Sequence, residues 1–149
     1  MNNASDIAHI IQLAVAPVFL LAGIGTLLNV IAARLGRAVD RARYLEEILT
    51  NAPEAARENY MPAQLAVLDR RIVFAQRSIY FSTVSALLVC IVVATLFVGA
   101  LAELNLAALV AILFIAAMLA LIGGLANFLA EVAIATRMLR VRTELTMKK

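Results

Sequence analysis

Three apolar runs, each long enough to cross a lipid bilayer, constrain the fold of this chain more than any other feature. They cover roughly residues 10–33, 79–101 and 104–130. A helix needs about 20 residues to cross about 30 Å of hydrocarbon, because it rises about 1.5 Å per residue. Membrane β-strands would instead alternate in polarity over about ten residues. The sequence therefore predicts an all-α membrane protein with three transmembrane helices, a class that also fits its 64% hydrophobic and 15% charged residues.

The basic residues fall on one side of a chain that crosses the bilayer three times. Eight of the thirteen lie between the first and second runs, and five follow the third. By the positive-inside rule that side is the cytoplasm. We expect a multi-pass membrane protein with its amino terminus outside and its carboxyl terminus in the cytoplasm.

The predicted cytoplasmic side carries thirteen basic and eight acidic residues, a balance of +5. Such a surface attracts anionic lipid head groups. Because the basic residues flank apolar runs, membrane topology explains them, and no nucleic-acid partner is expected. Residues 131–149 form a basic cytoplasmic tail.

Residues 34–77 are charged but keep a helical repeat of apolar positions. Two sets of five apolar residues are spaced by three and four: Leu35, Ala38, Ala42, Leu45 and Leu49, then Leu65, Leu68, Ile72, Ala75 and Ile79. This heptad spacing is typical of two helices packed side by side. Asn51, Pro53, Asn59 and Pro62 predict a connection over residues 50–63. We therefore expect a long cytoplasmic antiparallel helical hairpin between the first and second spans. Its charged faces are either solvated or a docking surface for a cytoplasmic protein or for lipid head groups.

Two stretches of the chain can be compared with a known family. They are "IAHIIQLAVAPVFLLAGIGTLLNVIAARLGRAVDRAR" and "LDRRIVFAQRSIYF", followed by two further spans. The sequence resembles the bacterial family of small integral membrane proteins catalogued as domain of unknown function 2721. The resemblance covers nearly the whole chain and implies a membrane architecture, without an activity or functional residues. Since this family is bacterial, the membrane would be the inner membrane.

Polar residues near the outer end of the first span are three positions apart. Asp6, His9 and Gln12 would form a stripe along one helix face. This stripe could bind a cation together with Glu103, but a set this small more simply consists of interfacial polar residues. We assign no metal site, no cofactor and no catalytic residues.

The third span has a face of small residues that ends in polar ones. Ala116, Ala120, Gly124, Asn127 and Glu131 recur at helical spacing. Small residues let helix backbones approach closely, so this face should pack on another helix of the same chain or of a second copy. Counting about 20 residues inward places Glu131 near the level of Arg34 and Arg77, the inner interface charges, and an ion pair with one of them is expected.

A sharper interpretation makes Asn29, Asn127 and Glu131 a polar ring around a pore. Charged side chains near membrane depth often mark ion pathways, and a ring of carboxylates would favour cations. Three spans give too little wall for a pore, so a homo-oligomeric ion channel would be needed. The alternative is a non-conducting membrane scaffold or accessory subunit that uses the hairpin to dock a partner. No phosphate loop, nucleophile elbow or metalloprotease motif occurs, so we do not expect an enzyme.

Overall fold

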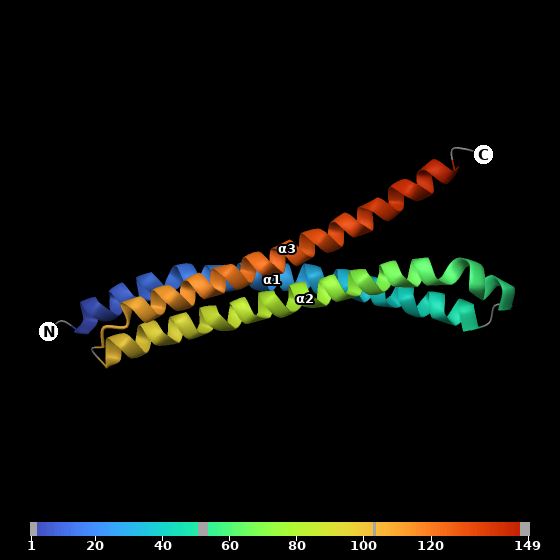
Figure 1. The fold of residues 1–149 in the computed structure, drawn as a ribbon. Helices are drawn as coiled ribbons and strands as arrows, with labels where there is room; N and C mark the ends of the chain where they lie inside the picture. The colour runs from blue at the N-terminus through green and yellow to red at the C-terminus, as the bar shows by residue number, and fades with distance from the viewer. Residues whose placement is uncertain (1–2, 51–53, 103, 147–149) are drawn as a thin grey trace. The chain divides into compact units, whose positions relative to one another are not determined.

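Three long helices form the regular structure of the chain (Figure 1). The computed structural model describes the backbone of residues 3–50, 54–102 and 104–146, and the side chains of residues 8, 11–48, 50, 68–102 and 104–136. The helices are α1 (Asn3–Thr50), α2 (Glu54–Leu101) and α3 (Ala107–Thr146). Each contains a stretch that is long and apolar enough to cross a membrane. The predicted all-α class with three membrane-capable helices is confirmed.

Helices α1 and α2 continue well beyond the length of a single span. Each has 48 residues, more than twice the about 20 residues that a span requires. Neither is interrupted where its apolar run ends, and Gly36 lies inside α1 with no neighbouring atom within 4 Å of an added Cβ. The cytoplasmic position of these extensions stays a prediction.

The helix boundaries differ from two predictions. Helix α2 already begins at Glu54, so Asn59 and Pro62 lie within it rather than in a connection over residues 50–63. A proline inside a helix removes one N–H donor but need not end the helix, and α1 likewise continues through Pro17. Helix α3 begins at Ala107 rather than at residue 104, because the N–H of Leu104 donates to the carbonyl oxygen of Gly99 at 2.9 Å in the connection.

The chain divides into two compact units, and the first comprises residues 1–29 and 80–124. Its buried core takes Ile24 from α1, Val89 from α2 and Ala117 from α3. The Ser85 hydroxyl donates to the carbonyl oxygen of Ala117 at 2.8 Å, tying α2 to α3. The outer surface carries large apolar side chains, among them Phe19 and Leu101, which are 75% and 81% exposed. An apolar exterior around a core with small and hydroxyl residues is what a lipid environment favours.

The second unit comprises residues 30–79 and 125–149. Its buried apolar residues are Ile31 and Ala38 of α1 and Leu68 and Ala75 of α2. The predicted seam also includes Leu35, Ala42, Leu45, Ile72 and Ile79, which are half-buried, while Leu49 and Leu65 lie outside the described side chains. Every described seam position is thus at least partly covered. The spacing read from the sequence identifies the face of each helix that is covered in this unit.

Candidate functional site

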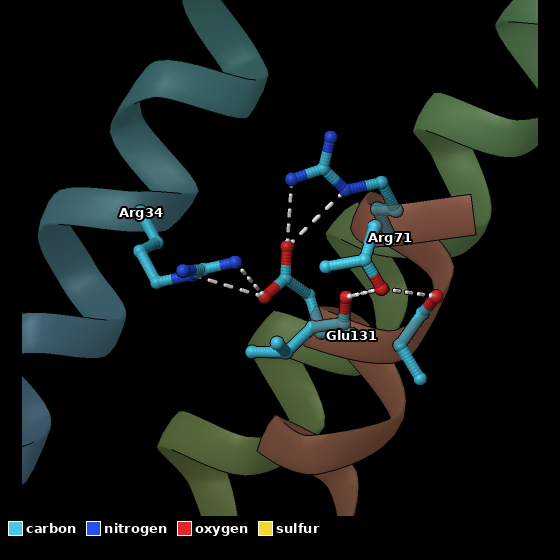
Figure 2. A network of polar contacts seen from close by, with 6 residues as sticks. Arg34, Arg71 and Glu131 are labelled. Atoms are coloured by element: carbon cyan, nitrogen blue, oxygen red, sulfur yellow. Dashed lines mark hydrogen bonds and ion pairs between the residues drawn. The ribbon is translucent and has the colours of Figure 1, made fainter. Parts of the chain in front are cut away.

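The most distinctive feature of the second unit is a buried carboxylate on α3. Glu131 is only 3% exposed, and both of its carboxylate oxygens are bonded to arginines (Figure 2). Arg34 of α1 and Arg71 of α2 approach it from two different helices. One acidic side chain therefore links all three helices of the unit.

Each arginine uses the same edge of its guanidinium group. Arg34 donates through Nε to Oε2 of Glu131 at 3.1 Å, and its Nη2 forms an ion-pair contact with the same oxygen at 3.1 Å. Arg71 donates through Nη2 at 2.8 Å and Nε at 3.2 Å to Oε1. Both carboxylate oxygens therefore accept charge-assisted hydrogen bonds, the strong kind. We call Arg34, Arg71 and Glu131 the charge cluster.

Aromatic rings accompany two arginines of this unit. The Arg34 guanidinium carbon lies 5.6 Å from the centre of the Phe128 ring, one turn before Glu131 on α3. On α2, the Arg70 guanidinium carbon lies 5.9 Å from the Phe74 ring. Both distances are within the range of a cation–π interaction. Arg34 is thus held by α3 through both a carboxylate and a ring.

The burial of the charge cluster determines its energetics. A carboxylate removed from water is stable only when paired and hydrogen-bonded, and Glu131 meets this condition. The side chains of Arg34 and Arg71 stay 30% and 21% exposed, so each guanidinium keeps some solvation. Removing either partner would leave a charge short of its counterion, and this makes the cluster costly to disrupt.

The predicted ion pair of Glu131 with one of the two inner interface charges is confirmed. Glu131 pairs with Arg34, whereas Arg77 is exposed. The second partner, Arg71, is not predicted, because depth along the span does not reveal which face of a helix a residue lies on. Buried residues Ala75, Ser78, Ser82 and Ser85 follow Arg71 at spacings of four and three. That stripe was the available signal, and Arg77 does not lie on it.

The small-residue face predicted on α3 is covered within the chain. Gly124 is buried, Ala116 and Ala120 are half-buried, and the adjacent Ala117 is fully buried. A Cβ added at the neighbouring Gly123 would lie 3.5 Å from the Phe81 ring of α2. The face therefore serves packing inside the first unit, one of the two roles expected for it.

The residues predicted as a polar ring have different surroundings. Asn29 on α1 is exposed, Asn127 is half-buried, and Glu131 is buried in the charge cluster. Asn127 and Glu131 are one turn apart on α3 and belong to the second unit, whereas Asn29 belongs to the first. Both carboxylate oxygens of Glu131 contact arginines.

The outer polar stripe is described at one position. The side chains of Asp6 and His9 lie outside the described residues, and Gln12 is exposed. Among the side chains that the structure describes, no group of three or more His, Cys, Asp and Glu residues could hold a metal ion.

A comparison with protein families assigns the chain to a family. The family model described as "Protein of unknown function (DUF2721)" matches residues 14–141. The chain belongs to the DUF2721 family. The match includes Arg34, Arg71 and Glu131, so the charge cluster lies within the DUF2721 region. The resemblance seen in the sequence is confirmed. No curated protein and no solved structure matches this DUF2721 chain.

Proposed function

We propose that this DUF2721 protein is a non-conducting membrane scaffold or accessory subunit whose hairpin docks a cytoplasmic protein. The observation that carries the proposal is the state of Glu131. A pore-lining carboxylate must face water and passing ions, but this one is 3% exposed and both oxygens accept hydrogen bonds from arginines of the same chain. Its role is then to fasten α3 to α1 and α2.

The small-residue face of α3 supports the same role for Glu131. Gly124 is buried and Ala117 is fully buried, so the small-residue face is used for packing. A face already covered inside one chain is poorly suited to line an aqueous axis.

One exposed face of the α1 extension has the composition of a docking surface. Arg37, Arg41, Tyr44 and Ile48 follow one another at spacings of four and three and are all exposed. Tyr44 is 61% exposed and Ile48 is 45% exposed. Tyrosine and arginine are enriched among residues that dominate binding energy. A partner with an acidic rim around an apolar patch would complement this face.

Ion flux from liposomes tests the non-conducting part of the proposal. Purified protein is reconstituted into potassium-loaded liposomes, and efflux is compared with empty liposomes and with liposomes containing gramicidin. We expect the protein to give the same rate as the empty liposomes. A protein-dependent leak that Glu131→Gln changes in rate or ion selectivity would overturn the proposal.

Photo-crosslinking in cells tests the docking part. A benzoylphenylalanine placed at Tyr44 should capture a discrete cytoplasmic protein. The matched control is Leu129, which is 68% exposed on the apolar part of α3 and should capture no soluble protein. Equal capture at both positions, or none at Tyr44 in cells that express the protein normally, would contradict docking through this face.

A homo-oligomeric channel is the second candidate, and Asn29 is the observation in its favour. Asn29 is exposed on α1, within the apolar run that ends at Ala33. An amide exposed to hydrocarbon is costly and is relieved by a hydrogen bond to another helix. A second copy presenting its own Asn29 would supply that bond. Asn29→Leu should then abolish both self-association and any flux.

A further inference from the structure

We infer that Arg34 and Arg71 form, on their outward edges, a binding site for the phosphate of an anionic lipid. This inference goes beyond the proposed function, since it holds whether or not the protein conducts ions or docks a partner. It depends on four properties of the charge cluster. These are the N–H donors that Glu131 does not use, the surplus positive charge, the fixed positions of the two guanidinium groups, and the depth of the cluster relative to the hydrocarbon.

The first property is the number of unused donors. A guanidinium group has five N–H bonds, and each arginine directs only its Nε and Nη2 edge at Glu131. The Nη1 end of each guanidinium is directed elsewhere. With side chains 30% and 21% exposed, both arginines can present those ends to the surroundings.

The second property is the charge. Two guanidinium groups and one carboxylate leave the cluster with one uncompensated positive charge. Near hydrocarbon such a charge is poorly solvated, so a counterion is favoured. A phosphodiester carries one negative charge and at least two acceptor oxygens, and guanidinium groups bind it with two parallel hydrogen bonds.

The third property is pre-organisation. Arg34 is fixed by two contacts to Oε2 and by the Phe128 ring at 5.6 Å, and Arg71 by two contacts to Oε1. Long arginine side chains normally lose rotamer freedom when they bind a ligand. Here Glu131 has already imposed that order, so less is lost when a phosphate binds.

The fourth property is depth. The apolar run of α1 ends at Ala33, immediately before Arg34, and that of α3 ends at Ala130, immediately before Glu131. The charge cluster is therefore in the first polar layer beyond the hydrocarbon on two helices. Lipid phosphates occupy this layer at high local concentration, whereas an acidic protein side chain would have to be brought to the hydrocarbon edge. These properties together favour a lipid as the occupant.

A lipid titration followed by native mass spectrometry tests the site. Full-length protein in uncharged detergent is titrated with dioleoylphosphatidylglycerol or dioleoylphosphatidylcholine. We expect tighter retention of phosphatidylglycerol by the wild type. Arg34→Gln and Arg71→Gln should each weaken it by about fivefold, the effect of one basic residue near a lipid surface. Arg43→Gln is the matched control, because Arg43 is exposed on α1 nine residues beyond Arg34, and it should weaken retention by less than about twofold.

Glu131→Gln separates a lipid site from a purely structural cluster. It removes the ordering of the two arginines but also removes the negative charge that competes with the phosphate. We expect the gain in charge to offset at least the loss of order, so phosphatidylglycerol retention should be equal or stronger. Retention that falls as far as in Arg34→Gln would overturn the inference, as would equal losses in Arg34→Gln and Arg43→Gln. If the circular dichroism of Glu131→Gln shows that this variant has lost its helices, its lipid retention is not interpreted. The comparison of Arg34→Gln with Arg43→Gln then decides whether the lipid site exists.

Inorganic phosphate distinguishes a lipid from a free anion. Millimolar phosphate is added to the phosphatidylglycerol complex, with sodium chloride at matched ionic strength as the control. We expect the same retention in both. Displacement by phosphate alone would overturn the lipid assignment in favour of a soluble anion.

Discussion

Arg71 on α2 and Glu131 on α3 meet at 2.8 Å between Nη2 and Oε1, although they are 60 positions apart in the sequence. The same two helices are also joined by the Ser85 hydroxyl and the Ala117 carbonyl oxygen. The Arg71–Glu131 contact lies in the second unit and the Ser85–Ala117 contact in the first. Each unit therefore has its own polar contact between α2 and α3.

Replacing the buried carboxylate should destabilise the protein strongly. In Glu131→Gln, two guanidinium groups lose their shared counterion. Breaking a fully buried pair costs about 3–5 kcal/mol, and the partial exposure of both arginines reduces this to about 2–3 kcal/mol. Thermal unfolding in detergent should begin about 4–12 °C lower. The control is Glu46→Gln, the same chemical change at an exposed α1 side chain, which should shift the midpoint by less than about 2 °C.

Replacing Arg71 and replacing Arg77, both on α2, should affect the thermal stability of the protein differently. Arg71→Gln removes two donors from Glu131, whereas Arg77→Gln alters an exposed side chain. Thermal unfolding should be lowered clearly by the first variant and hardly by the second. Equal effects would mean that total charge, rather than the contact with Glu131, determines stability.

A larger side chain at a buried position of α3 should destabilise the core of the first unit. Ala117 is fully buried and packs with Ile24 and Val89. Ala117→Leu would force the helices apart, at a cost of about 1–3 kcal/mol. Ala111→Leu makes the same change at an exposed position of α3 and should be tolerated. Detergent-solubilised yield and thermal unfolding of the two variants give the comparison.

The direction of insertion can be tested with two single cysteines. The free Cys90 is first replaced by alanine. A cysteine at Ala102, in the connection before α3, should react from outside sealed cells with an impermeant maleimide. One at Arg43, exposed on α1, should react only after permeabilisation. The opposite pattern would reverse the predicted orientation.

The architecture was predictable because hydrophobic length and helical period dominate this sequence. Each of the three apolar runs lies in one of the three helices, and the heptad spacing correctly predicted the helix faces that are covered around Ala38 and Ala75. Helix ends were less predictable, since Pro62 lies inside α2 rather than ending it. A proline signal is local, and it does not reveal whether a helix ends or continues past it.

The site was only half predictable for a geometric reason. Counting residues gives depth, and depth alone brought Arg34 and Glu131 to one level. The choice between Arg71 and Arg77 depends on which face of α2 meets α3. That face carries the buried residues Ala75, Ser78, Ser82 and Ser85. Arginine side chains are also long enough to reach a partner at a neighbouring level.

Direct contact between Arg71 and Glu131 should be measurable as a coupling energy in a double-mutant cycle. Arg71→Gln, Glu131→Gln and the double variant are compared by reversible unfolding in detergent. We expect the double variant to lose at least about 1 kcal/mol less than the sum of the single variants, since removing both partners leaves fewer unpaired charges. Additive losses, within about 0.3–0.5 kcal/mol, would mean that the two side chains act independently and that Glu131 does not join the helices through this contact.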